Sequence, residues 1–130
     1  LQLRVRDALL HACPALGPVV LEAYLLRGTQ HPFDLWFPRW EIAAEVDGRQ
    51  HFTGNYHSKP ASVLWQDDRK LDALCGNRKL RLLRFHHADE KQWGWLVQWA
   101  VAQVQQNPHC QFVACTNSYA KEAAKQALTL

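Results

Sequence analysis

Several features are missing from this chain, and each absence narrows what it can be. No apolar run approaches the roughly 20 residues that a helix needs to cross a bilayer, and no secretory signal pattern opens the sequence. Its 130 residues include no methionine, and the first residue is Leu1. We therefore expect a single domain over residues 1–130, without a membrane segment and excised from a longer chain.

The cysteines lack the short paired spacing of zinc sites. They are Cys13, Cys75, Cys110 and Cys115. We interpret them as free thiols in an intracellular, reducing compartment, either the cytoplasm or the nucleoid. Of the seven histidines, His86, His87 and His109 have no partner at zinc-ligand spacing, so they do not predict a zinc site.

Charge of neither sign is in large excess, because 15 basic residues face 12 acidic ones and give a net charge of +3. This balance permits a polyanionic partner without requiring one. The basic residues cluster in two places, and we expect both clusters to flank the path of a nucleic-acid backbone. The clusters are Arg69-Lys70 and the group of Arg78, Lys79, Arg81 and Arg84.

A β-hairpin over residues 33–51 is the most informative stretch that the sequence does contain. Its first strand is predicted over 33–37 and its second over 41–47, with Pro38-Arg39 as the turn and Gly48 as the end. Both strands are short and apolar, yet the stretch is crowded with carboxylates. The hairpin therefore combines a structural signal with a chemical one.

The carboxylates of the second strand fall on one face. Side chains alternate along a strand, so Glu41, Glu45 and Asp47 share a face, and Asp34 on the partner strand can reach the same point. Three carboxylates in a row repel one another, and a divalent cation would relieve the repulsion. Oxygen ligands that leave room for water and phosphate suit Mg²⁺ or Mn²⁺. His51 follows as a candidate proton shuttle or phosphate contact.

The remaining elements predict an α/β domain with a mixed sheet flanked by helices. Residues 19–26 fit a strand or a helical turn equally well, and the loop at 51–60 offers His57 and Lys59 as candidate phosphate contacts. A hairpin strand followed by a helix and another strand forms a crossover with parallel pairing. Further strands are predicted over 79–85 and 111–116. Helices are predicted over 3–13, 61–75 and 119–130, and a long helix is predicted to begin within residues 89–92 and to end at Asn107-Pro108. The buried stripe of the long helix is expected to be Trp93, Leu96, Val97, Ala100, Val101 and Val104.

A set of residues between about 30 and 100 matches a known pattern: Asp34, the run Glu45-Val-Asp47-Gly48, His51, Asp67-Asp68-Arg69 and the strand closing on Leu83-Arg84-Phe85. With these residues the chain resembles the PD-(D/E)XK nuclease superfamily, in particular its branch of Vsr-type very-short-patch-repair endonucleases and EDxHD homing endonucleases. The resemblance implies a restriction-endonuclease-like three-layer fold and Mg²⁺-dependent cleavage of phosphodiesters, in DNA more than in RNA. It also implies a neighbouring DNA-binding domain.

The resemblance also implies roles for individual side chains. Asp34 and Glu45 look like metal ligands, and His51 looks like the general base or leaving-group shuttle. Asp47 stands where much of the superfamily has Lys, which leaves open whether it is a third ligand or orients His51. The resemblance does not choose between Asp67 and Asp68 as the next site residue. Arg69 or Lys70 would steady the charge on the phosphorane.

Two alternatives compete with the nuclease. The run Glu45-Val-Asp-Gly-Arg-Gln-His-Phe52, with Asn55 and Pro60, is also similar to RAP domains, which implies binding of RNA in an organelle without cleavage. The third interpretation is an interaction domain whose Trp93, Trp95 and Trp99 form a partner surface.

Overall fold

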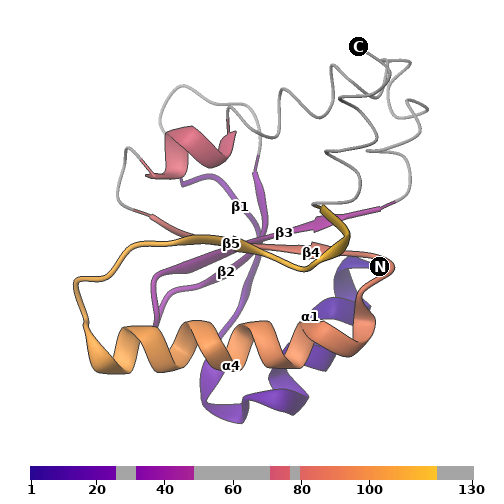
Figure 1. Ribbon diagram of the computed structural model, residues 1–130, viewed down its shortest axis with the longest axis horizontal. Coiled ribbons are helices and arrows are strands. Elements are labelled where there is room, and N and C mark those ends of the chain that lie inside the picture. The colour runs from indigo at the N-terminus through magenta and orange to yellow at the C-terminus, as the bar shows by residue number, and fades with distance from the viewer. Residues whose placement is uncertain (26–31, 49–70, 77–79, 120–130) are drawn as a thin grey trace.

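The computed structural model describes residues 1–25, 32–48, 71–76 and 80–119, and their centre is a five-stranded mixed sheet (Figure 1). The strands are β1 Val20–Ala23, β2 Phe33–Phe37, β3 Ile42–Asp47, β4 Arg81–His86 and β5 Val113–Cys115, and they lie in this order across the sheet. The first three pair antiparallel and the last three parallel. The predicted hairpin is confirmed, and so is the parallel pairing of its second strand with the strand predicted over 79–85. β1 decides the open choice at 19–26 in favour of a strand.

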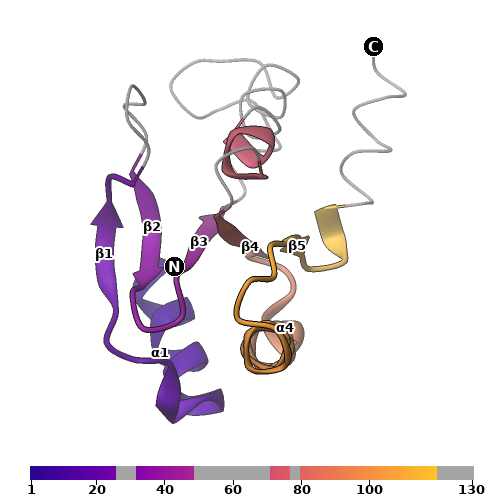
Figure 2. The same cartoon turned by 90° about the vertical axis from the view of Figure 1, so that its left-hand side faces the viewer.

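Helices cover both faces of the sheet (Figure 2). α1 Gln2–Ala12 and α4 Glu90–Gln106 lie side by side on one face, with the short 3₁₀ helix η1 Pro14–Leu16 after α1. Residues 71–76 are helical and lie over the other face. The coarse prediction of an α/β domain with a mixed sheet flanked by helices is therefore confirmed. In the part of the chain that is described, no helix has the length and apolarity to span a bilayer.

The two faces of β3 contribute to different apolar cores. Ile42, Ala44 and Val46 belong to the main core under α1 and α4, whereas Ala43 joins a smaller cluster with Leu82 of β4. The predicted alternation along this strand is confirmed, and it places Glu45 and Asp47 on the face that α1 and α4 leave open. The stripe that α4 buries is the predicted one: Trp93, Leu96, Val97, Ala100, Val101 and Val104.

The structure corrects two expectations about charged residues. Glu41 is exposed and belongs to the turn, with a left-handed φ of 51°, so only Glu45 and Asp47 share the acidic face of β3. Arg81 and Arg84 are buried in the central strand β4 and do not flank an exposed nucleic-acid path. A charged residue in such a strand must find partners inside the protein.

The three tryptophans of α4 that the interaction-domain interpretation names differ in exposure. Trp93 is fully buried, and its indole Nε1 donates to the carbonyl of His86 at 3.0 Å. Trp99 is half-buried against Phe112. Trp95 is the one exposed tryptophan of the three, because it falls outside the buried stripe of the helix.

Gly94 lies where α4 meets α1 and should tolerate no larger residue. A Cβ at this position would stand 2.9 Å from the Cβ of Ala12. We expect Gly94→Ala to lower the free energy of unfolding by about 1 kcal/mol, because overpacking costs about 1–3 kcal/mol and the gain in helix propensity is about 1 kcal/mol. Urea unfolding measures the change. Gly76→Ala is the control, since its Cβ would meet no described atom within 4 Å; equal effects of both changes would contradict the prediction.

Candidate functional site

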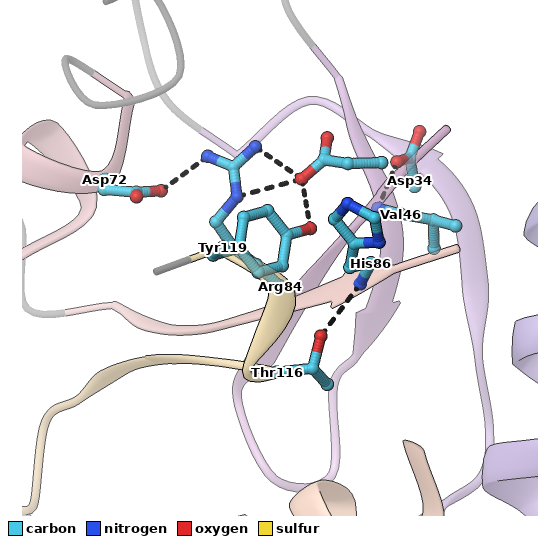
Figure 3. Close-up of polar contacts among 8 residues, drawn as sticks. Asp34, Val46, Asp72, Arg84, His86, Thr116 and Tyr119 are labelled. Atoms are coloured by element: carbon cyan, nitrogen blue, oxygen red, sulfur yellow. Dashed lines mark hydrogen bonds and ion pairs between the residues drawn. The ribbon is translucent and has the colours of Figure 1, made fainter. Parts of the chain in front are cut away.

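Asp34 and Glu45 face each other across the hairpin. The register pairs Leu35 with Ala44, and its continuation by one residue places Asp34 opposite Glu45. The Asp34 carboxylate accepts a hydrogen bond from the backbone N–H of Val46 at 2.7 Å (Figure 3). The Asp34 carbonyl accepts another from the side chain of Gln2 at 2.7 Å. Two neighbouring elements therefore fix Asp34 beside the second strand.

The Glu45 carboxyl is in an environment that disfavours its charge. Burial is the main reason that its pKa is raised well above the usual value, followed by the nearby negative charges of Asp34 and Asp47. Arg84 opposes this rise, and a hydrogen bond with Asp34 adds to it. The Oε1 atom of Glu45 is buried without a hydrogen-bond partner among the described residues. Either a proton or a cation at this carboxyl would relieve the repulsion.

Asp47, in contrast, is bound to a buried arginine. Its Oδ2 atom accepts from Nε and Nη2 of Arg84 at 3.0 and 2.6 Å, and also from the hydroxyl of Tyr119. The third guanidinium nitrogen of Arg84 donates to Asp72 at 3.0 Å, as Figure 3 shows. Burial and the charge of Asp47 raise the pKa of Tyr119, so its hydroxyl remains a donor. Arg84 thus joins β3, β4 and the helical residues 71–76.

The segment after β5 is fixed by polar contacts that place Tyr119. Asp89, just before α4, accepts from the backbone N–H of Ser118 at 2.9 Å and from its hydroxyl. Burial alone would raise the pKa of Asp89, but hydrogen bonds from Ser118 and Thr116 outweigh it and lower the pKa. The Thr116 hydroxyl also accepts from the backbone N–H of His86 at 3.1 Å. These contacts hold Tyr119 over the Asp47 carboxylate.

The structure brings together Asp34, Glu45 and Asp47 of the predicted site residues. The other predicted residues lie outside the described part of the chain; they are His51, His57, Lys59, Asp67, Asp68, Arg69 and Lys70. Their roles stay predictions. Across residues 1–25, 32–48, 71–76 and 80–119, no three His, Cys, Asp or Glu side chains are arranged to hold a metal ion. Asp34 and Glu45 form a pair, and Asp47 is directed to Arg84.

The four cysteines are free thiols, as predicted. Cys75 is buried beside the site, and this burial, with the charges of Asp72 and Glu45, raises its pKa to about 12. A thiol that holds its proton this firmly is a poor nucleophile.

Sequence reasoning missed Asp72 and Tyr119 as site residues and assigned Arg84 to an exposed surface. One signal could have identified Arg84. It is the arginine of a central, apolar strand that pairs with the acidic strand β3, and a buried charge in that position requires a carboxylate partner. Comparisons of the chain with models of protein families, with curated proteins and with solved structures found no match.

Proposed function

We propose that this protein is a metal-dependent endonuclease that hydrolyses phosphodiester bonds of DNA and has the restriction-endonuclease-like fold of the Vsr and EDxHD branch. The observation that carries the proposal is the pair formed by Asp34 and Glu45. Two carboxyl groups on adjacent strands repel each other, and the half-buried Glu45 has a buried Oε1 atom with no hydrogen-bond partner among the described residues. Such a pair does not stabilise the fold, and a bound cation would relieve the repulsion between its charges.

The donor set of the pair fits Mg²⁺ or Mn²⁺. Mg²⁺ sites commonly use one or two carboxylates and complete the coordination with waters and substrate phosphate. Asp34 and Glu45 would hold the cation, which when bound polarises the phosphate and lowers the pKa of an attacking water. Glu45 must lose its proton before it can act as a ligand, so cation binding should strengthen as the pH rises.

The other proposed roles concern side chains outside the described residues. His51 would accept the proton of the attacking water or return one to the leaving group. Arg69 and Lys70 would neutralise charge on the phosphate, with His57 and Lys59 as further contacts. Asp67 or Asp68 would complete the acidic set. A neighbouring DNA-binding domain of the full-length protein would supply most of the affinity for the substrate.

The test is nicking of supercoiled plasmid DNA by the purified chain. We expect nicking with Mg²⁺ or Mn²⁺, none with EDTA, and a loss of about 100-fold or more in the Asp34→Asn variant, because a metal ligand is removed while the side chain keeps its size. Asp7→Asn is the matched control, since Asp7 is exposed and paired with Arg6. Nicking that persists equally in Asp34→Asn would show that the activity does not come from this site.

One observation favours a second candidate function, a RAP-like RNA-binding domain that does not cleave. Asp47 is already neutralised by Arg84. A binding protein needs no cation at the acidic pair. Binding of RNA with a steep dependence on salt, without turnover of DNA or RNA in Mg²⁺ or Mn²⁺, would favour this function over the nuclease.

A further inference from the structure

The guanidinium of Arg84 divides the acidic side chains of the site into two groups. In the register of β3 and β4, Arg84 is the partner of Glu45. Its Nε and Nη2 atoms nevertheless donate to the carboxylate of Asp47. Asp34 and Glu45 remain together on the hairpin, while Asp47, two residues further along β3, is directed to the arginine.

The Asp47 carboxylate is held toward Arg84 by more than one contact. The Tyr119 hydroxyl donates to the same carboxylate oxygen, and the guanidinium of Arg84 lies 5.5 Å from the centre of the Tyr119 ring. Asp47 and Arg84 are only 1% and 3% exposed. If Asp47 turned away, two buried donors would lose their acceptor, which is unfavourable in an environment that excludes water.

Arg84 is also anchored independently of Asp47. Its Nη1 atom donates to Asp72 at 3.0 Å, and the Asp72 side chain is 25% exposed. This second ion pair fixes the plane of the guanidinium, because an arginine bound through two sides has little rotational freedom. The direction of Asp47 therefore follows from a fixed partner.

We propose that Arg84 is a positioning residue that keeps Asp47 out of the coordination shell of the cation held by Asp34 and Glu45. This inference rests on the proposed function. It assigns Asp47 a role in holding the fold of the site instead of a role as third ligand. A site with fewer carboxylates binds the cation less tightly and leaves positions for water and a substrate phosphate.

Removing Arg84 should tighten the binding of Mn²⁺. In Arg84→Gln, Asp47 loses its cationic partner and becomes available to the cation, so we expect the dissociation constant to fall about tenfold, as the charge of the ligand set increases. The gain should disappear in the double variant Arg84→Gln/Asp47→Asn, and Arg84→Lys, which keeps the charge, should stay near the native value. Electron paramagnetic resonance of free Mn²⁺ measures the constants, with Mn²⁺ as the only added probe. A role of Arg84 in stability alone would lower the unfolding temperature without tightening Mn²⁺ binding.

Asp47→Asn in the native background decides the proposal even where Arg84→Gln does not fold. Asparagine keeps the size of the side chain and an acceptor for Arg84, so we expect Mn²⁺ binding within about threefold of native, beside a loss of roughly 100-fold in Asp34→Asn. A loss in Asp47→Asn as large as that in Asp34→Asn would overturn the inference and leave the proposed function intact. A native chain that binds no Mn²⁺ would overturn both.

Discussion

Glu45→Gln is expected to lower the rate of metal-dependent cleavage by about 1000-fold and, at neutral pH, to make the protein more stable. The loss of activity follows from the removal of a charged ligand for the cation. The gain in stability follows from the position of Glu45, whose charge is disfavoured by burial and by Asp34 and Asp47. Opposite changes in activity and stability are typical of residues that are kept for function although they destabilise the fold.

The gain in stability of Glu45→Gln over the native protein should increase as the pH rises. In the folded protein the pKa of Glu45 lies well above its usual value near 4.5, whereas the unfolded chain keeps the usual value. Between these two pKa values the folded state binds more protons, so the stability that Glu45 contributes is lost as the pH rises. Glutamine does not titrate there. The difference in unfolding temperature between Glu45→Gln and the native protein should therefore grow from pH 4.5 toward neutral pH.

Thermal unfolding in EDTA at several pH values measures this difference, and plasmid nicking in Mg²⁺ measures the activity. Glu41→Gln is the matched control, since Glu41 lies in the same hairpin but is exposed in the turn. It should leave both measurements nearly unchanged. Cleavage at the native rate by a folded Glu45→Gln protein would remove Glu45 from the site. A lower unfolding temperature at neutral pH would show that the Glu45 charge is stabilised in the fold.

The parts of the fold that periodicity determines could be predicted from the sequence. Alternation of apolar and polar residues predicted the faces of β3, and the helical spacing from Trp93 to Val104 predicted the buried stripe of α4. The site pair Asp34 and Glu45 could be predicted for the same reason. The short turn of the hairpin allows few registers between its strands, and this restriction brings Asp34 and Glu45 together.

The partners of Asp47 were harder to predict than the acidic pair, because they come from distant parts of the chain. Arg84 is 37 residues away from Asp47 and Tyr119 is 72 residues away. Arg84 approaches Asp47 through the parallel pairing of β3 with β4. The approach of Tyr119 depends on the packing of the segment after β5 against Asp89, which no local pattern indicates. The strand over 79–85 was predicted, but its two arginines look like surface residues until the strand is known to be buried on both faces.

Arg81→Met is expected to lower the free energy of unfolding by about 3 kcal/mol or more, because it removes a buried cation that binds three backbone carbonyls. Nε donates to the carbonyl of Cys110 at 2.8 Å, Nη1 to that of Trp40 at 2.7 Å and Nη2 to that of Pro108. These carbonyls belong to the hairpin turn and to the connection between α4 and β5. Methionine fills a similar volume but leaves all three without this donor.

Arg39→Met makes the same chemical change at an exposed position, where the guanidinium donates to the carbonyl of Ala15 at 3.4 Å and lies 5.6 Å from the centre of the Trp40 ring. It should alter the free energy by no more than about 0.5 kcal/mol. Urea unfolding of both variants gives the comparison, and similar effects would contradict the role assigned to Arg81.

Arg81 lies at the start of β4, where the parallel register pairs it with Ile42. Three residues further on, the same register pairs Arg84 with Glu45. A folded Arg81→Met protein that binds Mn²⁺ as the native one does would show that β3 and β4 hold this register without the arginine, whereas weaker binding would show that the register of the acidic pair depends on it.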